Sequence, residues 1–241
     1  MSLKNELEYS GNWLFRYRSY LPILLFPFIL YFLKNTQGFK LSQYLVAISI
    51  TTSYIGQIIR IFTVAFIPPG TSGRNTKHQS AKQLNTSGIY SKVRHPLYLG
   101  NYFILLGPCI LTNNYYLMII YTLIFWIYYE RIMFAEEVFL QKKFYNEFNE
   151  WSINVPAIIP NLKTYIPSHG RFSIIQVLER EYTGVCGILF LFLILILCSN
   201  IINNVAEYTS PIWIILFILN AIIYFSLRRI KKHRRKYFTK K

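Results

Sequence analysis

Two apolar runs with three polar residues between them occupy the middle of the chain: LYLGNYFILLGPCIL at 97–111, TNN at 112–114 and YYLMIIYTLIFWIYY at 115–129. Each run is apolar enough to form a helix within a hydrocarbon core. A three-residue connection leaves only an antiparallel hairpin, so both outer ends of the pair emerge on the same side of the membrane. This topology brings residues 88–100 close to residues 130–137.

Further apolar runs flank this hairpin, at about residues 21–33, 41–67, 184–202 and 211–227. Together with the hairpin they predict roughly six membrane spans, with five and seven as the bounds. We therefore expect an all-α fold, a polytopic membrane helix bundle that forms one domain over residues 1–241. Mixed residues precede the first run and no small-residue cleavage site follows it, so it is interpreted as a retained span rather than a signal peptide.

The chain is strongly basic, with 26 Lys and Arg against 10 Asp and Glu. If the spans alternate, most of these cations fall on one side, and the positive-inside rule then predicts that both termini are cytoplasmic. The basic tail at 228–241 directly follows a span, which favours attraction to anionic headgroups and argues against nucleic-acid binding. Cys109, Cys186 and Cys198 lie in apolar runs without metal-ligand spacing, so we expect buried thiols and no metal site.

Two longer segments are expected on the cytoplasmic side. Residues 68–88 are rich in turn formers and small polar residues, which predicts a loop. Residues 136–151 predict a cytoplasmic amphipathic helix that packs against the bundle or lies in the headgroup layer. Its apolar positions recur at spacings of three and four: Leu140, Phe144, Phe148 and Trp151.

Charged residues gather where the first helix of the hairpin begins, at Arg94-His95-Pro96. Proline suits the first helical turn because its missing amide would have no partner there, so a plain span start with two interfacial residues is one interpretation. The other is a polar pocket, since a helix N-terminus offers free amides to an anionic group. Aromatic edges and bare backbone lie beside the same corner: Gly88, Tyr90, Tyr98 and Gly100.

A carboxylate pair, Glu136-Glu137, follows the second helix of the hairpin. Adjacent residues point to different faces of a helix, so only one of the two easily enters a given pocket, and a solvated surface pair is the alternative. Glu130 and Arg131 precede the pair, and charges this close to hydrocarbon usually pair or line a polar cavity. Arg60 lies inside another run, where snorkelling to the surface is favoured over a pocket role.

One series of motifs resembles the isoprenylcysteine carboxyl methyltransferase family, whose relatives include the phospholipid N-methyltransferases. The series is Gly88-x-Tyr90-x-x-x-Arg94-His95-Pro96-x-Tyr98-x-Gly100, then Glu136-Glu137-x-x-Leu140, Phe144-Tyr145-x-x-Phe148 and Val155-Pro156. The resemblance covers about residues 55–160, which we expect to form a methyltransferase-like core. Phospholipid methyltransferases commonly have Gly-x-Gly where this chain has Gly100-Asn101-Tyr102.

The resemblance implies a cytoplasm-facing pocket for S-adenosylmethionine and a lipidic or prenylated acceptor that enters from the bilayer. It implies that the cofactor site is lined by His95, Tyr98, Leu99, Gly100, Glu136 and Glu137. Methyl transfer depends mainly on proximity and orientation. A carboxylate acceptor needs no general base, whereas an amine acceptor could need one.

Arg94 or Arg131 could orient an anionic acceptor, and these two are the hypothetical catalytic residues. Two other functions stay open. Sterol-reductase-type enzymes have a similar Arg-His-Pro-Tyr-type region and bind NADPH. A non-catalytic membrane protein or transporter is the other alternative, although intramembrane acidic relays are not obvious.

Overall fold

A computed structural model describes residues 1–35, 42–68, 71, 79–163, 165–168, 170–203 and 211–238 of the chain. All regular elements in these residues are helical, as expected. In chain order they are α1 (Leu3–Tyr17), α2 (Leu21–Asn35), α3 (Gln43–Phe66), the short 3-10 helix η1 (Gly88–Ser91), α4 (Pro96–Leu111), α5 (Tyr115–Lys143), α6 (Tyr145–Asn154), α7 (Ile174–Ile202) and α8 (Pro211–Phe238).

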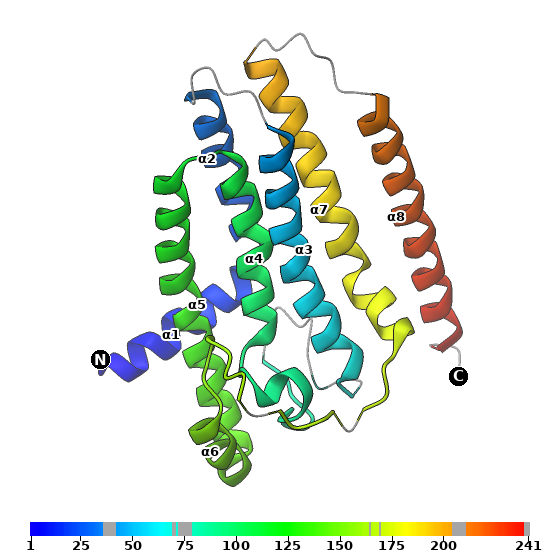
Figure 1. Ribbon diagram of the computed structural model, residues 1–241. Coiled ribbons are helices and arrows are strands. Elements are labelled where there is room, and N and C mark those ends of the chain that lie inside the picture. The colour runs from blue at the N-terminus through cyan, green and yellow to red at the C-terminus, as the bar shows by residue number, and fades with distance from the viewer. Residues whose placement is uncertain are drawn as a thin grey trace.

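The long helices form a membrane bundle. Among the described residues, four segments are long and apolar enough to cross a bilayer: Gln43–Phe66, Tyr115–Lys143, Ile174–Ile202 and Trp213–Arg234. Two shorter apolar helices, Ile23–Asn35 and Pro96–Leu111, complete the six apolar runs that the sequence predicts. Figure 1 shows α3, α4 and α7 side by side in the bundle, with α8 at its edge next to α7. The chain is an integral membrane protein.

The hairpin of α4 and α5 is confirmed. Asn113 takes a left-handed conformation at φ 51°, which asparagine tolerates better than most residues. The side chain of Asn114 then caps α5 by accepting a hydrogen bond from the backbone amide of Leu117 at 3.1 Å. Two asparagines thus complete the reversal between the helices.

Small residues allow α3 and α4 to cross closely. A Cβ atom at Gly56 would lie 2.3 Å from the carbonyl oxygen of Gly100, and one at Gly107 would lie 2.1 Å from the Ser53 hydroxyl. The Ser53 hydroxyl also donates to the carbonyl of Ile104 at 2.8 Å. Close backbone approach and interhelical hydrogen bonds drive helix association where lipid tails are as apolar as the side chains.

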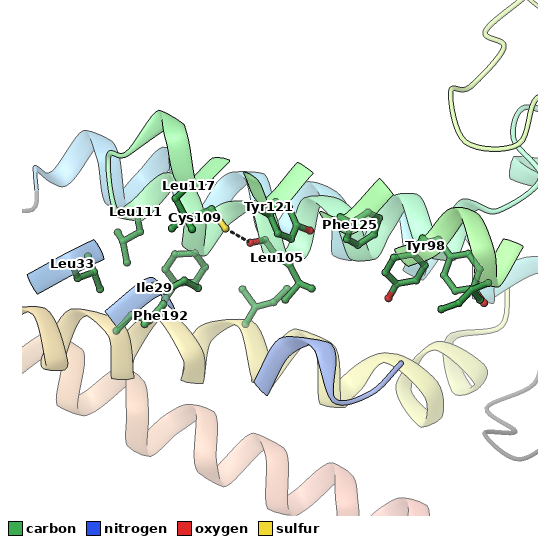
Figure 2. Packing of buried hydrophobic residues seen from close by; sticks show 14 of the residues in the cluster. Ile29, Leu33, Tyr98, Leu105, Cys109, Leu111, Leu117, Tyr121, Phe125 and Phe192 are labelled. Atoms are coloured by element: carbon green, nitrogen blue, oxygen red, sulfur yellow. Dashed lines mark hydrogen bonds between the residues drawn. The ribbon is translucent and has the colours of Figure 1, made fainter. Parts of the chain in front are cut away.

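An aromatic and aliphatic core fills the space between α4, α5 and α7 (Figure 2). Phe125 and Phe192 are among its fully buried members. Cys109 lies in the same cluster and its thiol donates to the Leu105 carbonyl, drawn as a dashed line. Cys186 is also buried and Cys198 is half-buried, so the expected packing role of the cysteines is confirmed for the first two.

The helix expected near 136–151 is divided. α5 continues through Lys143, and the backbone breaks at Phe144 (φ −127°, ψ 45°) before α6 begins. Because a helix rises about 1.5 Å per residue, the 29 residues of α5 span more than the roughly 30 Å of a hydrocarbon core. Its last turns therefore extend beyond the membrane and carry the polar residues of the carboxylate motif.

The amphipathic helix α1 was not anticipated from the sequence. It crosses the lower part of the bundle obliquely and lies along α5 (Figure 1). Contact is tight at Gly11, where a Cβ atom would lie 2.0 Å from the Arg131 carbonyl oxygen. Phe15 is buried against the bundle, while Trp13 and Tyr17 are exposed. The segment expected as a loop at 68–88 is irregular at 79–87, and residues 69–70 and 72–78 lie outside the described residues.

Candidate functional site at the start of α4

His95 stands immediately before α4 and is fixed there by its backbone. Its amide donates to the Ala157 carbonyl at 3.1 Å, and the amide of Arg94 donates to the Pro156 carbonyl at 2.9 Å. Pro96 then occupies the first helical position, where no amide is needed. The segment after α6 thus holds the polar motif in place, which explains why Val155-Pro156 belongs to the same series of motifs.

The imidazole of His95 lies between two carboxylates of α5, those of Glu136 and Glu137. Its Nε2 is 2.9 Å from Oε1 of Glu137, and its Nδ1 is 3.5 Å from Oε2 of Glu136. The proximity of the two hairpin ends predicted from topology is therefore confirmed. Arg94 joins the cluster, because its Nε is 2.9 Å from the same Glu137 oxygen and its Nη1 donates to the Ser152 carbonyl at 3.0 Å.

The surroundings of His95 favour its protonated form. Burial lowers the pKa of the ring, but hydrogen bonds and charge from Glu136 and Glu137 outweigh this and raise the pKa above its usual value of 6.5. A protonated ring donates from both nitrogens and so satisfies both carboxylates. The cluster is a compact array of two cations and two anions at the end of a membrane helix.

Aromatic rings continue the site into the bundle. The ring of Tyr98 stacks on His95 with centroids 5.7 Å apart and contacts Tyr129 at 4.7 Å. The indole of Trp151 donates to the Tyr90 carbonyl at 3.0 Å, which ties α6 to the 3-10 helix η1 beside the same corner. These rings pack next to the charged array.

A cavity of about 530 Å³ opens beside this corner. The residues that line it come from α1, α3, α4, α5, α6, α7 and the segment around 79–85. Among the residues predicted from sequence, the lining includes Arg94, His95, Tyr98 and Glu136. The volume falls within the roughly 300–1,000 Å³ of small-molecule sites.

The other predicted site residues stand behind this wall or away from it, within the described part of the chain. Glu137 pairs with His95 and Arg94 from behind. Leu99 is half-buried next to Gly100, and a Cβ atom at Gly100 would lie 2.5 Å from Arg60 Cγ. The Arg131 guanidinium donates to the Ser10 hydroxyl of α1 at 3.3 Å.

A second ionic cluster lines the same cavity and was missed by sequence reasoning. Arg60 of α3 donates from Nε and Nη2 to the two oxygens of Glu181 in α7, each at 2.9 Å. Its Nη1 donates to the side-chain oxygen of Asn101 at 2.8 Å, and Asn101 in turn donates to the Tyr129 hydroxyl at 3.3 Å. The expectation that Arg60 snorkels is wrong, because its partner lies inside the bundle.

One signal in the sequence could have found this cluster. Glu179-Arg180-Glu181 directly precedes the most apolar run, and charges next to hydrocarbon usually mark a polar cavity. The departure from Gly-x-Gly is at Tyr102, and Asn101, at the variable position of that pattern, joins Arg60 to Tyr129.

Comparisons with known proteins find similarity over a region that includes both polar motifs. Residues 42–147 match the family model of phospholipid methyltransferases. The chain is 29% identical over 109 residues to a protein-S-isoprenylcysteine O-methyltransferase of Schizosaccharomyces pombe, covering 44% of this chain and 45% of that protein. It is 26% identical over 134 residues to the enzyme of the same name in Tribolium castaneum, covering 53% and 46%.

A relative of another description is the cobalt-zinc-cadmium resistance protein CzcN of Cupriavidus metallidurans, 37% identical over 82 residues, covering 34% of this chain and 38% of that protein. The chain spans about half the length of the curated isoprenylcysteine methyltransferases that it matches. No solved structure matches. The matched region includes α3, α4 and α5 and ends before α7.

Proposed function

We propose that the protein is an S-adenosylmethionine-dependent membrane methyltransferase that acts on a lipidic or prenylated acceptor, because residues 42–147 match the family model of phospholipid methyltransferases. One observation carries the proposal. The two motif ends meet, with His95 between Glu136 and Glu137, on the wall of a cavity at the end of the membrane helices. A polar, partly aromatic cavity in this position suits a charged cofactor and an acceptor anchored in lipid.

The residues present fit S-adenosylmethionine. The carboxylate of Glu136 lines the cavity and suits an ammonium or ribose hydroxyl groups, and the aromatic side chains of Tyr90 and Trp151 also line it. Arg94, which lines the cavity, suits the carboxylate of the cofactor. Glu137, Leu99 and Gly100 support this wall rather than line it, so we propose a positioning role for them.

The chemistry that the cofactor supplies is an activated methyl group: the acceptor lone pair forms the new bond to carbon as the carbon–sulfur bond breaks and its electrons stay on sulfur. The protein has to align the acceptor and exclude water. The His95 cluster holds α4 against α5, and the Arg60 cluster holds α3 against α7, so the walls of the cavity are fixed by ion pairs.

Arg94 and Arg131 differ as candidates for orienting the acceptor. Arg94 lines the cavity and keeps its proposed role. Arg131 contacts Ser10 of α1, so an acceptor role requires that it leave this contact. We also propose that the cavity end and both termini face the cytoplasm, since the tail and the segments around the site carry most of the basic residues.

Calorimetric titration of the detergent-purified protein with S-adenosylmethionine, its demethylated product and NADPH tests the proposal. We expect micromolar binding of the sulfonium compound, and loss of binding in Glu136→Gln although this variant remains folded. Lys142→Ala, an exposed position on the same helix, is the matched control and keeps wild-type binding.

Binding of NADPH without binding of S-adenosylmethionine would overturn the proposal in favour of a reductase. Absence of binding by all three compounds would favour a non-catalytic protein. With binding established, lipid extraction after labelling with methyl-tritiated cofactor identifies the acceptor.

A further inference from the structure

An exposed row of aromatic rings follows one face of α1 and the turn after it. Its members recur at spacings of four, four and three residues, which places them on one side of a helix. The rings also touch, with centroids 4.8 Å apart in the first contact and 6.1 Å apart in the next. Each residue is between 47% and 72% exposed, and the aromatic row consists of Tyr9, Trp13, Tyr17 and Tyr20. A continuous exposed apolar surface of this kind marks an interaction site.

The opposite face of α1 packs on the bundle and reaches the cavity. The Tyr128 hydroxyl of α5 donates to the Leu14 carbonyl at 3.1 Å. Phe15 and Arg18 line the cavity. The Arg18 guanidinium lies 3.7 Å from the centroid of the Phe15 ring, and its Nη1 donates to the Phe15 carbonyl at 2.9 Å. The helix α1 therefore stands between the cavity and whatever covers the aromatic row.

Contacts with α5 give the depth of α1 in the membrane. Counted from Tyr115, where α5 begins, about 20 residues cross the hydrocarbon core. Tyr128 and Arg131, which contact the second half of α1, lie about 20 and 24 Å along the helix axis, near the edge of that core. Lys142, which contacts Glu8, lies about 40 Å along and beyond it. The helix α1 thus descends from outside the membrane to the edge of the hydrocarbon, across the lower part of the bundle and above α6 (Figure 1).

The aromatic row continues directly into the surface that α2 exposes to lipid. The amide of Tyr20 donates to the Tyr17 carbonyl at 2.9 Å, and the amide of Ile23 donates to the Tyr20 carbonyl at 3.0 Å, so the chain turns from α1 into α2 without an intervening loop. Apolar side chains of α2 are then exposed one after another, among them Ile23, Leu24 and Phe28. A surface that continues a lipid-facing helix at the depth of the headgroups favours the bilayer as its partner.

The residue types agree with this partner. Tyrosine and tryptophan are enriched at the membrane–water interface, because their rings leave water while the hydroxyl or indole N–H stays among the headgroups. Arg16 lies on the same face as Tyr9 and Trp13 by helical spacing, and a cation there suits the phosphates of the headgroup layer.

We propose that α1 is an interfacial helix: the aromatic row lies in the headgroup layer of the bilayer, and this attachment holds Phe15 and Arg18 in the wall of the cavity. Binding of such a helix grows with the apolar area that it buries in the interface. The attachment is independent of the reaction that the cavity supports.

Fluorescence quenching in lipid nanodiscs tests the position of the row with the full-length protein. Trp13 is one of four tryptophans, so its emission is the difference between the wild type and Trp13→Phe. We expect strong quenching of this emission by lipids brominated close to the headgroup, weaker quenching by lipids brominated near the chain end, and little quenching by iodide in water. A tryptophan placed by Tyr145→Trp in the Trp13→Phe background is the control: Tyr145 is an exposed aromatic residue of α6, beyond the end of α5, so we expect quenching by iodide there.

Trypsin cleavage in the same nanodiscs tests whether the attachment holds the wall. In the double variant Trp13→Ser, Tyr17→Ser we expect cleavage after Arg16 and Arg18 to be about tenfold faster than in the wild type, because the released helix leaves the bundle more often. Tyr145→Ser removes an equally exposed ring away from α1 and keeps the wild-type rate. Circular dichroism verifies that the variants are folded.

Quenching of Trp13 by iodide but not by the brominated lipids overturns the proposal, because the row would then lie in water. Protection from both kinds of quencher also overturns it and indicates that another protein or a second copy covers the row. An unchanged cleavage rate in a folded double variant shows that the row does not hold the wall, and overturns the proposal as well.

Discussion

The His95 cluster and the Arg60 cluster line one cavity but are assembled differently. His95 meets Glu136 and Glu137 across a hairpin whose two helices are joined by three residues, so chain connectivity brings the partners together. Arg60 meets Glu181 across a separation of 121 residues, and nothing in the connection between α3 and α7 requires it. The His95 cluster thus follows from the short connection between two helices, whereas the Arg60 cluster forms only through packing of the bundle.

Removal of Arg60 gives the largest effect expected in this comparison. Arg60→Leu leaves the Glu181 carboxylate buried at 3% exposure without its cation, which costs about 3–5 kcal/mol of stability. Chemical or thermal unfolding in detergent measures this loss. The double variant Arg60→Leu, Glu181→Leu should recover most of it, because no buried charge is left alone; a double variant as unstable as the single one contradicts the pairing.

Adding a methyl group where α3 crosses α4 tests whether the close packing of these helices supports the Arg60 cluster. In Gly100→Ala the new Cβ atom meets Arg60 Cγ at 2.5 Å and the Gly56 carbonyl at 2.8 Å, so we expect about 1–3 kcal/mol of destabilisation. The control is Gly187→Ala in α7, where no described atom lies within 4 Å of the added Cβ. Equal stability of the two variants would show that the crossing tolerates a wider spacing.

The His95 cluster should respond to pH. The pKa of His95 is raised in the folded protein above 6.5, since the two glutamates outweigh burial. The stability contributed by the protonated ring is therefore fully present below pH 6.5 and is lost as the pH rises through the folded-state pKa. The unfolding temperature of the wild type should therefore fall as the pH is raised from 6.5 through the folded-state pKa of His95. In His95→Gln this fall should be absent. A rise in wild-type stability with pH would refute the assignment.

The smallest effect is expected where an ion pair lies outside both clusters. Lys142 contacts Glu8 at 2.8 Å, but the lysine is 68% exposed. Lys142→Ala should change the free energy of unfolding by about 0–1 kcal/mol, as measured by the same denaturation. A larger loss of unfolding free energy would show that this exposed contact between α1 and α5 stabilises the protein more than a surface ion pair usually does.

Much of the fold could be predicted from the apolar runs. Their lengths predict the six apolar helices, and the three residues between α4 and α5 predict the meeting of Arg94–His95 with Glu136–Glu137. The break at Phe144 was not predictable in the same way, because helical periodicity continues through it. The helix α1 was missed because its mixture of polar and apolar residues does not by itself indicate a partner. Its apolar side is explained by the contact with α5.

The order of apolar runs and polar ends in the sequence was enough to predict a membrane bundle, the hairpin and the polar corner at the start of α4. These features depend on hydrophobic length and chain connectivity, which are local properties. The tertiary structure alone decided that Arg60 faces Glu181 and that Gly100 supports a helix crossing. Such contacts depend on which faces of distant helices meet. Small residues allow a close helix crossing, but the partner helix and its orientation are defined only in the packed bundle.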